Sequence, residues 1–298
     1  MRLNKEEKVR LNKMLSLIVT VTLIIVLGSG SAVAQEKKSA DEIAKELANP
    51  AGSLASLNFN LQYTEFTGDL PRSDDQESTA LTFQPSLPFP VGDKGRRIIF
   101  RPLIGMSFDQ PVFNAAKGDF DSEDTNLLDT TFDLVYAGTN MTSKQDGYLW
   151  GMGMAGTLPT ASDDDLGSDQ WRFGPELFGG IIRKWGIVGA LVSHQWDTGG
   201  SNDTNYSATA AQYFYAYGLG GGWQIASSPV LSYDWKADSD DAWTVPLGFG
   251  VAKTTKIGNM PFKFAFQVQK YVVQPDTFGP DWLVKLTVTP VVKNPFIF

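Results

Sequence analysis

Residues 57–64 read Leu-Asn-Phe-Asn-Leu-Gln-Tyr-Thr, a strict alternation of apolar and polar side chains. The apolar side chains share one face of an extended strand, because successive side chains point to opposite sides. The same two-residue period returns at 81–89, 98–107, 130–137, 148–155, 171–181, 243–251, 262–269 and 282–289. Segments 187–196, 209–218 and 223–233 are also strand-like, without so strict an alternation. These segments predict twelve strands, each about as long as a tilted membrane strand.

The polar faces favour a membrane barrel over a soluble β-sandwich, which also alternates. They are rich in Gly, Gln, Thr and Asn and include charges, which a sandwich core cannot hold unpaired. We therefore expect an all-β fold: a transmembrane antiparallel β-barrel of about twelve strands, with a short helix before the first. The side chains that we expect in the lumen, as selectivity elements, are Gln84, Arg101, Asp133, Arg172, Glu176, Lys263, Gln267 and Lys285.

Aromatic residues stand near the ends of the apolar faces, where a barrel carries an interfacial girdle. The expected girdle residues are Tyr63, Trp150, Trp171, Trp223, Trp243 and Trp282.

The connections between the expected strands alternate in length and in charge. The odd connections carry 21 acidic residues against three basic ones. The even connections are mostly shorter and carry seven basic residues against two acidic ones. Long outer loops and short periplasmic turns are typical of an outer-membrane barrel. With twelve strands, both termini lie on the periplasmic side.

The first 34 residues predict a cleaved signal peptide. Five basic residues precede the apolar run 14–28, and Ala32 and Ala34 form a small-residue cleavage site before Gln35. Cleavage leaves 20 Lys and Arg against 31 Asp and Glu, an acidity that argues against a nucleic-acid partner. The chain has no cysteine, so it has neither disulfides nor a thiolate metal site. Beyond the leader, no apolar run is long enough for a membrane helix, which leaves a closed barrel as the way to span a bilayer.

Residues 35–52 are expected to form a periplasmic N-terminal segment, and 53–298 the barrel. Ser39 and Glu42 form an S-x-x-E capping box, and Ile43, Ala44 and Leu47 follow at helical spacing before a proline. At the other end, Phe298 provides the terminal aromatic by which we expect the outer-membrane assembly machinery to recognise the chain. Lipid and lipopolysaccharide are the other expected partners.

Several stretches resemble a family of outer-membrane transporters related to the phenol MetA degradation pathway proteins, some of them labelled after neuromedin U. These stretches are Leu47-Ala-Asn-Pro50, GALVSHQW at 189–196, WTVPLGFGVAK at 243–253 and GPDW at 279–282. The resemblance implies a barrel with a transport-like role for hydrophobic or aromatic compounds, and it implies no particular binding residues.

Three motifs suggest other chemistry. Residues 151–156, GMGMAG, match the dinucleotide pattern G-x-G-x-x-G, but no helix follows to hold a pyrophosphate. Residues 119–124 are acidic but lack the glycine and glutamate of an EF-hand loop, which leaves loose divalent binding or solvated loop charge. His194 is the only histidine, and the adjacent Ser193 must point to the opposite face of its strand, so the two cannot form a catalytic pair. We expect no catalytic residues, no metal and no cofactor.

The predicted function is passage of a small solute across the outer membrane. Two alternatives remain open. One is a structural or surface-interaction barrel of the outer membrane that transports nothing. The other is an outer-membrane phospholipase-like enzyme in which a serine other than Ser193 is the nucleophile. The lumen charges allow either a salt-bridge network that fills the barrel or a constriction that selects permeants.

Overall fold

The computed structural model describes residues 38–92, 94–123, 125–201 and 204–294. One helix, α2 (Ala40–Leu47), comes before the series of long strands. The expected signal peptide and the terminal Phe298 lie outside the described residues. In the part of the chain that is described, no helix is long and apolar enough to cross a membrane.

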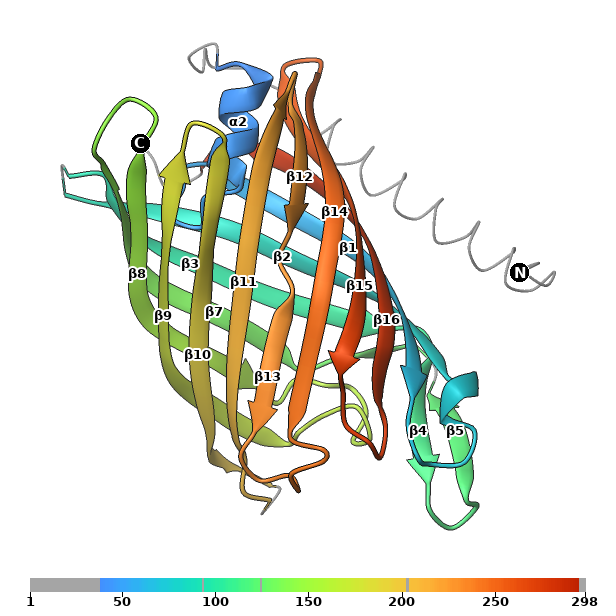
Figure 1. Cartoon of the computed structure of the whole chain (residues 1–298). Coiled ribbons are helices and arrows are strands. Elements are labelled where there is room, and N and C mark those ends of the chain that lie inside the picture. Colours follow the sequence, from blue (N-terminus) through green and yellow to red (C-terminus); the bar gives the residue numbers. More distant parts are fainter. Residues whose placement is uncertain (1–37, 93, 124, 202–203, 295–298) are drawn as a thin grey trace. The chain divides into compact units, whose positions relative to one another are not determined.

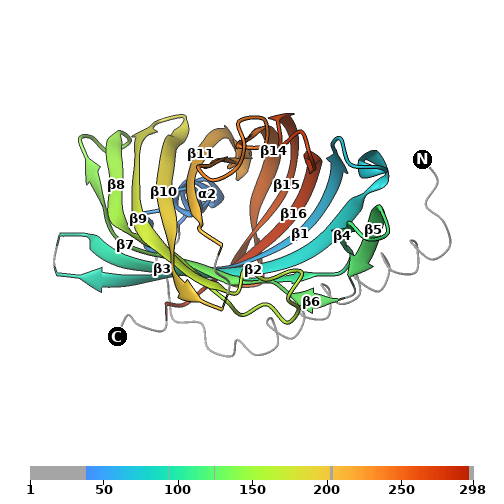
Figure 2. The ribbon, with the colours of Figure 1, turned by 90° about the horizontal axis from the view of Figure 1, so that it is seen from below.

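The wall strands are β1 (Ala55–Thr67), β2 (Glu77–Val91), β3 (Arg96–Ser107), β7 (Thr130–Met141), β8 (Gly147–Leu158), β9 (Gln170–Arg183), β10 (Gly186–Gly200), β11 (Ser207–Gly220), β12 (Trp223–Ser227), β13 (Val230–Asp234), β14 (Trp243–Ile257), β15 (Met260–Val273) and β16 (Gly279–Val292). All pair antiparallel with their neighbours, and β1 pairs with both β2 and β16 (Figures 1 and 2). Because β12 and β13 are two pieces of one wall strand, the ring is a closed barrel of twelve strands, as predicted.

The two-residue period places apolar side chains on the outside of this barrel. Leu177, Leu247 and Phe249 are each about 60% exposed. Such large exposed apolar side chains are expected on a surface that contacts lipid and not water. Along β16, β1 and β2 the inward side chains form a polar ladder. Thr287 donates a hydrogen bond to Asn60 (2.8 Å), and Asn60 donates in turn to Thr82 (3.0 Å). The alternation in 57–64 therefore separates an apolar outer wall from a polar inner one.

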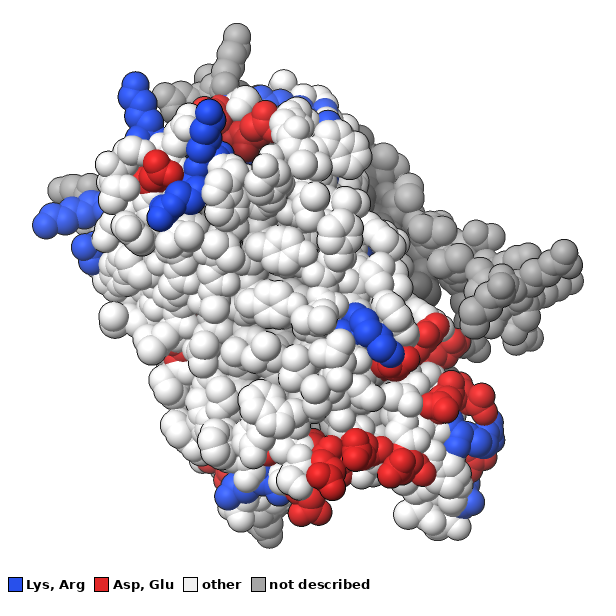
Figure 3. Space-filling model, in the orientation of Figure 1, with Lys and Arg blue, Asp and Glu red and all other residues white. Residues whose placement is uncertain are grey.

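The two ends of the barrel differ in structure. At one end, a hairpin of β4 (Gln110–Asn114) and β5 (Asp119–Glu123) projects from the wall, next to β6 (Asn126–Leu127) and the short 3-10 helix η1 (Ser73–Asp75). At the other end are the short turns and α2 (Figure 1). In the space-filling view of Figure 3, Asp and Glu gather along the end with the hairpin, and several Lys and Arg stand at the end with α2. The charge asymmetry predicted for the connections is present.

The helix α2 begins with the predicted capping box. The Glu42 N–H donates to the Ser39 hydroxyl at 3.2 Å, and the Ser39 N–H donates back to the Glu42 carboxylate at 2.7 Å. This reciprocal pair satisfies backbone donors that the first turn of a helix leaves without partners.

Candidate functional site in the barrel lumen

The N-terminal segment occupies the short-turn end of the barrel. Helix α2 contacts β11, β12, β14 and β15. Its Asp41 carboxylate accepts hydrogen bonds from the N–H groups of Gly221 (3.2 Å) and Gly222 (2.6 Å), in the turn between β11 and β12. Its Lys45 ammonium donates to the carbonyls of Gln145 (3.2 Å) and Arg183 (2.7 Å) in two other turns. The helix is thus tied to the rim at several points.

Residues after the helix continue this attachment inside the wall. The Asn49 side chain donates to the Thr139 hydroxyl at 3.1 Å, and the Arg97 guanidinium donates to the Ala51 carbonyl at 3.1 Å. Ala51 is almost completely buried. The segment therefore enters the barrel before β1 begins.

In the short-turn half of the lumen, an apolar cluster that the sequence analysis did not identify packs against the N-terminal segment. Ala51 belongs to it, and Ala48 and Phe214 pack against it. Its other members come from the inner faces of β3, β7, β8, β9 and β10: Ile99, Val135, Ala137, Leu149, Phe178, Ile182, Ile187 and Leu191. These side chains lie at the inward strand positions that we expected to be polar. Their apolar character is visible in the sequence and could have indicated the cluster.

The centre of the charged site is a cluster of Arg101, Asp133 and Glu176. Arg101 and Asp133 are register partners on β3 and β7, and the Arg101 Nη2 atom lies 2.9 Å from Asp133 Oδ2. The same nitrogen lies 3.9 Å from Oε1 of Glu176 on β9, whose side chain is fully buried. Neither oxygen of Glu176 has a hydrogen-bond partner within the described part of the chain. One guanidinium therefore lies within ion-pair distance of two carboxylates, one on β7 and one on β9.

Two lysines face the lumen from strands on the far side of the ring from Glu176. Lys263 lies on β15 and Lys285 on β16, and β16 is six strand positions from β9 in the ring. Among residues 38–294, leaving out the undescribed gaps, no carboxylate lies within ion-pair distance of either lysine. The lumen thus carries two carboxylates and one arginine on β3, β7 and β9, and two lysines on β15 and β16. Such an arrangement places an electric field across the pathway.

A polar cavity lies between the N-terminal segment and this charged level. The charged side chains that line it are Glu46, Arg101 and Lys263. Neutral polar groups complete much of the lining: Asn49, Ser56, Asn58, Gln84, Ser86 and Thr289. The structure thus brings three predicted lumen residues, Arg101, Lys263 and Gln84, to one cavity.

The remaining lumen candidates lie elsewhere. Gln267 is buried beside Lys285, its register partner, and its amide nitrogen has no hydrogen-bond partner in the described structure. Arg172 stands near the outer-loop end of β9, where its guanidinium lies 3.7 Å from the centroid of the Tyr206 ring. It therefore belongs to the outer mouth and not to the central cluster.

The predicted girdle residues lie at both ends of the outer wall. Trp171, Trp243 and Trp282 are exposed near the outer-loop ends of their strands, and Trp223 is exposed at the short-turn end. Three indoles of the predicted set have a basic side chain over the ring, as in the pairs Arg96–Trp150 (4.9 Å), Lys253–Trp223 (5.0 Å) and Lys270–Trp282 (5.1 Å). Long cationic side chains that reach from an apolar wall toward the headgroups adopt this arrangement.

The only histidine faces outward and meets a serine that the sequence analysis did not name. Ser193 is buried on the lumen side, as the strand period required. The Ser207 hydroxyl lies 3.3 Å from His194 Nε2, and the Thr209 hydroxyl lies 2.8 Å from Nδ1. Two residues on β11 thus flank both nitrogens of the imidazole, a relationship across strands that linear spacing does not reveal.

The glycine motif at 151–156 belongs to β8 and not to a strand-to-helix turn. A Cβ added to Gly151 would lie within 2.7 Å of several ring atoms of Phe178. The glycine therefore makes room for a lumen aromatic, which is the role expected from its position in a strand.

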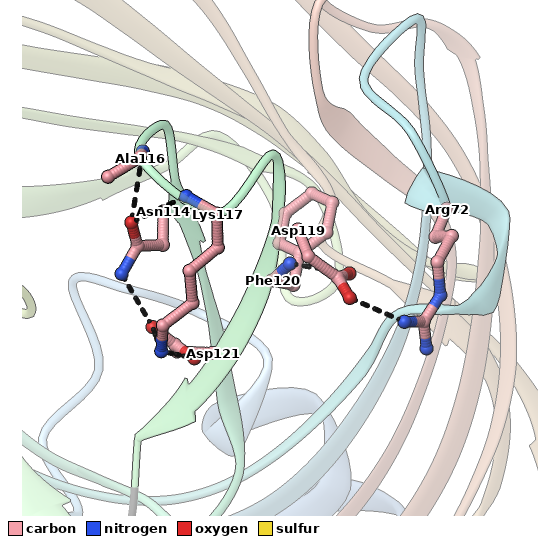
Figure 4. Close-up of polar contacts among 7 residues, drawn as sticks. All are labelled: Arg72, Asn114, Ala116, Lys117, Asp119, Phe120 and Asp121. Carbon is pink, nitrogen blue, oxygen red and sulfur yellow. Dashed lines mark hydrogen bonds and ion pairs between the residues drawn. The ribbon is translucent and has the colours of Figure 1, made fainter.

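The acidic residues at 119–123 form one arm of the β4–β5 hairpin (Figure 4). Arg72 Nη1 contacts Asp119 at 2.7 Å, and the Lys117 ammonium contacts Asp121 at 2.7 Å. Asn114 also donates to Asp121 at 2.9 Å. The described residues contain no group of three or more ligating side chains suited to a metal. Asp119 and Asp121 therefore bind neighbouring side chains of the hairpin and of the connection that holds Arg72.

Comparison with known proteins finds similarity in structure alone. No family model matches the sequence, and no curated protein matches it. The COG4313 outer membrane channel from Pseudomonas putida F1 superposes with a TM-score of 0.60 at 13% identity, over 80% of this chain and 95% of that chain. The NanC porin gives a TM-score of 0.43 at 8% identity over 79% and 99%, and OccAB3 of Acinetobacter baumannii gives 0.36 at 9% over 80% and 98%. The first of these likenesses shows that the chain shares the fold of an outer-membrane channel.

Proposed function

We propose that this protein is an outer-membrane channel that passes a small solute through its lumen. The observation that carries the proposal is the pairing of an apolar outer wall with a charged inner one, which carries Arg101, Asp133, Glu176, Lys263 and Lys285. A cation on the lipid side would cost about 2–4 kcal/mol at the midplane, whereas inside it meets polar partners and a permeant.

The fold shared with the COG4313 outer membrane channel supports this proposal. The acidic loops at one rim and basic turns at the other support insertion with the loops outward, after export and signal-peptide removal near Ala34. For the solute we propose a small hydrophobic or aromatic compound, the class implied by the resemblance to the phenol MetA-related transporters. Lipid, lipopolysaccharide and the assembly machinery are the proposed partners.

Conductance in planar bilayers tests the channel directly. Refolded protein should produce a steady ion current, because the charged cavity beside the N-terminal segment offers a hydrated path. A structural or surface-interaction barrel would leave the bilayer closed. Heat-modifiable gel mobility of the same sample establishes that the barrel is folded, so a silent bilayer with a folded barrel would contradict the channel.

One observation favours a second function, ester hydrolysis on the outer face. Ser207 and His194 lie at hydrogen-bond distance on the lipid side, with the aromatic rings of Trp196 and Trp235 close by. An imidazole beside a hydroxyl can take its proton and activate it as a nucleophile. Phospholipase activity that disappears in both Ser207→Ala and His194→Ala would support this function. Activity that survives in His194→Ala would end it.

A further inference from the structure

The polar cavity beside the N-terminal segment is large enough for a small molecule. Inward side chains of five neighbouring strands, β15, β16, β1, β2 and β3, form one side of it, and the N-terminal segment forms the other. Its volume is about 110 Å³. Because an apolar cavity of about 150 Å³ holds benzene, this one holds a molecule of about five non-hydrogen atoms.

Lys263 brings a positive charge into this cavity that no group of the described structure neutralises. Within residues 38–294, outside the undescribed gaps, its ammonium group forms neither an ion pair nor a hydrogen bond. Its register partners are neutral: Thr254 on β14 and Thr289 on β16. An ammonium group has three donors and loses hydration inside a protein, so a negatively charged acceptor stabilises it there.

Arg101 adds a second cation at the other edge of the same wall. Its Nη2 atom lies 2.9 Å from Asp133 and 3.9 Å from Glu176, but neither carboxylate belongs to the lining of the cavity. Among the described residues, the carboxylate that does line it is Glu46 of α2, which accepts a hydrogen bond from the Ser53 hydroxyl. The lining therefore carries two positive charges against one negative charge, and a ligand with a single negative charge balances it.

The uncharged part of the lining also differs between the two sides. On the wall, the side chains that make no hydrogen bond with another described residue are Ser56, Gln84 and Ser86. A carboxylate has two oxygens that accept several hydrogen bonds, so it can use such groups as well as the cations. The N-terminal segment offers apolar surface, from Leu47, Pro50 and Leu54. One side of the cavity thus suits a carboxylate and the other a short hydrocarbon chain.

A second lysine lies on the approach from the outer loops. Lys263 pairs with Thr289, and Lys285 precedes Thr289 on β16, toward the outer-loop end, by a rise of about 13 Å. Its ammonium group likewise forms no ion pair in the described part of the chain, and its register partners, Gln62 and Gln267, are neutral. Successive positive charges along a narrow path raise the local concentration of anions.

We propose that the cavity is a binding site for a short-chain monocarboxylate, whose carboxylate contacts Lys263 and Arg101 and whose chain lies against the N-terminal segment. This inference rests on the proposed channel function and deepens it by naming the class of solute that binds beside the segment. A neutral solute leaves Lys263 without a counter-charge, and an inorganic anion leaves the apolar side of the cavity uncovered. A carboxylate also matches the planar fork of an arginine.

Binding of propionate to the refolded mature protein tests the site. Propionate matches the cavity in size, and propionamide is its uncharged counterpart. Line broadening of the ¹³C-labelled carbonyl group in NMR gives the Kd of each. Lys263→Gln should raise the Kd of propionate about tenfold, because it removes a charged hydrogen-bond donor. Lys253→Gln is the matched control: it removes the same charge from the outer wall beside Trp223 and should leave the Kd unchanged.

Two further variants separate the site from a general loss of structure, and heat-modifiable gel mobility establishes that each barrel is folded. Lys263→Arg keeps the charge and should keep the Kd within about threefold of the original value. Glu46→Gln removes the opposing charge of the lining and should lower the Kd about threefold. Propionamide that binds as tightly as propionate, or an unchanged Kd in Lys263→Gln, would overturn the site. Displacement of propionate by an equal concentration of chloride would overturn the carboxylate as its ligand.

Planar bilayers relate the site to the channel. Propionate at a concentration equal to its Kd occupies about half of the sites, so it should reduce the chloride current about twofold in the unmodified protein and in Lys253→Gln. In Lys263→Gln the same concentration should reduce the current by only about a tenth. If the folded protein binds propionate and passes no current, the channel function fails and the site stands. If it passes a current that propionate does not reduce, and NMR shows no binding, only the site fails.

Discussion

Arg101 and Asp133, 32 positions apart in the sequence, are register partners on adjacent strands, and their side chains meet at 2.9 Å inside the barrel. Glu176 lies 3.9 Å from the same Nη2 nitrogen and is completely buried. Because one cation serves two carboxylates, the balance of charge at this level of the lumen depends on Arg101.

We expect Arg101→Leu to destabilise the barrel by about 2–4 kcal/mol, because it leaves two carboxylates in the wall without their cation. The change should appear as a lower urea midpoint in refolding experiments. Arg172→Leu, which removes a guanidinium stacked on Tyr206 at the outer mouth, should cost less. Adding Asp133→Leu to Arg101→Leu should restore part of the loss. A double variant less stable than the single one would contradict the pairing.

The lysines of the opposite wall should set ion selectivity. Lys263→Gln and Lys285→Gln each remove a positive charge from the lumen, so the reversal potential in a salt gradient should shift toward cation preference. Lys253→Gln is the matched control: it removes the same charge from the outer wall, where Lys253 covers the Trp223 ring. An equal shift in this control would remove the two lysines from the permeation path.

The outer connections should loosen in acid because of Asp129. Burial alone would raise the pKa of this carboxyl, but hydrogen bonds from the Ser168 hydroxyl and from the N–H groups of Ser168, Ala161 and Thr160 outweigh it and hold the pKa below its usual value. A carboxyl with a lowered folded-state pKa contributes stability above its unfolded pKa of about 3.9. That stability is lost as the pH falls through the folded-state value.

Hydrogen exchange at residues 159–169 measures this effect. We expect protection to be constant from pH 7 to about pH 5 and to fall below about pH 4. In Asp129→Asn the exchange should be faster at neutral pH and should lose its acid transition. An acid transition that persists in Asp129→Asn would assign it to another group.

Much of the fold could be predicted because barrel strands follow a local rule. The alternation at 57–64 recurs in most wall strands, and it separates lipid from lumen without knowledge of which strands pair. The capping box at Ser39 and Glu42 is equally local. The break at 228–229 was not predicted: a single strand was expected at 223–233, and the structure divides it into β12 and β13 at Ser228 and Pro229, which has no N–H for a ladder.

The site could be predicted only in part, for the same reason. The strand period placed Arg101, Asp133 and Glu176 on the inner face but could not show that they share one ion cluster. It also treated inward positions as polar, whereas Ile99 and Phe178 pack against the N-terminal segment there. That packing depends on where residues 39–54 lie, and no periodicity within the strands contains this information.

The attachment of α2 to the rim should control how far the lumen is open. Asp41 accepts two backbone hydrogen bonds from the β11–β12 turn, and Lys45 donates to two carbonyls of other turns. Asp41→Ala with Lys45→Ala removes all four contacts, so the helix should leave the mouth more often and mean conductance should rise. Lys184→Ala is the control, because it removes an exposed cation from the same rim. The apolar contacts of Ala48 and Ala51 remain in the double variant, so we expect the current to switch between two levels and not to stay high. A current identical to that of the unmodified protein would mean that the four contacts do not keep α2 in the mouth of the barrel.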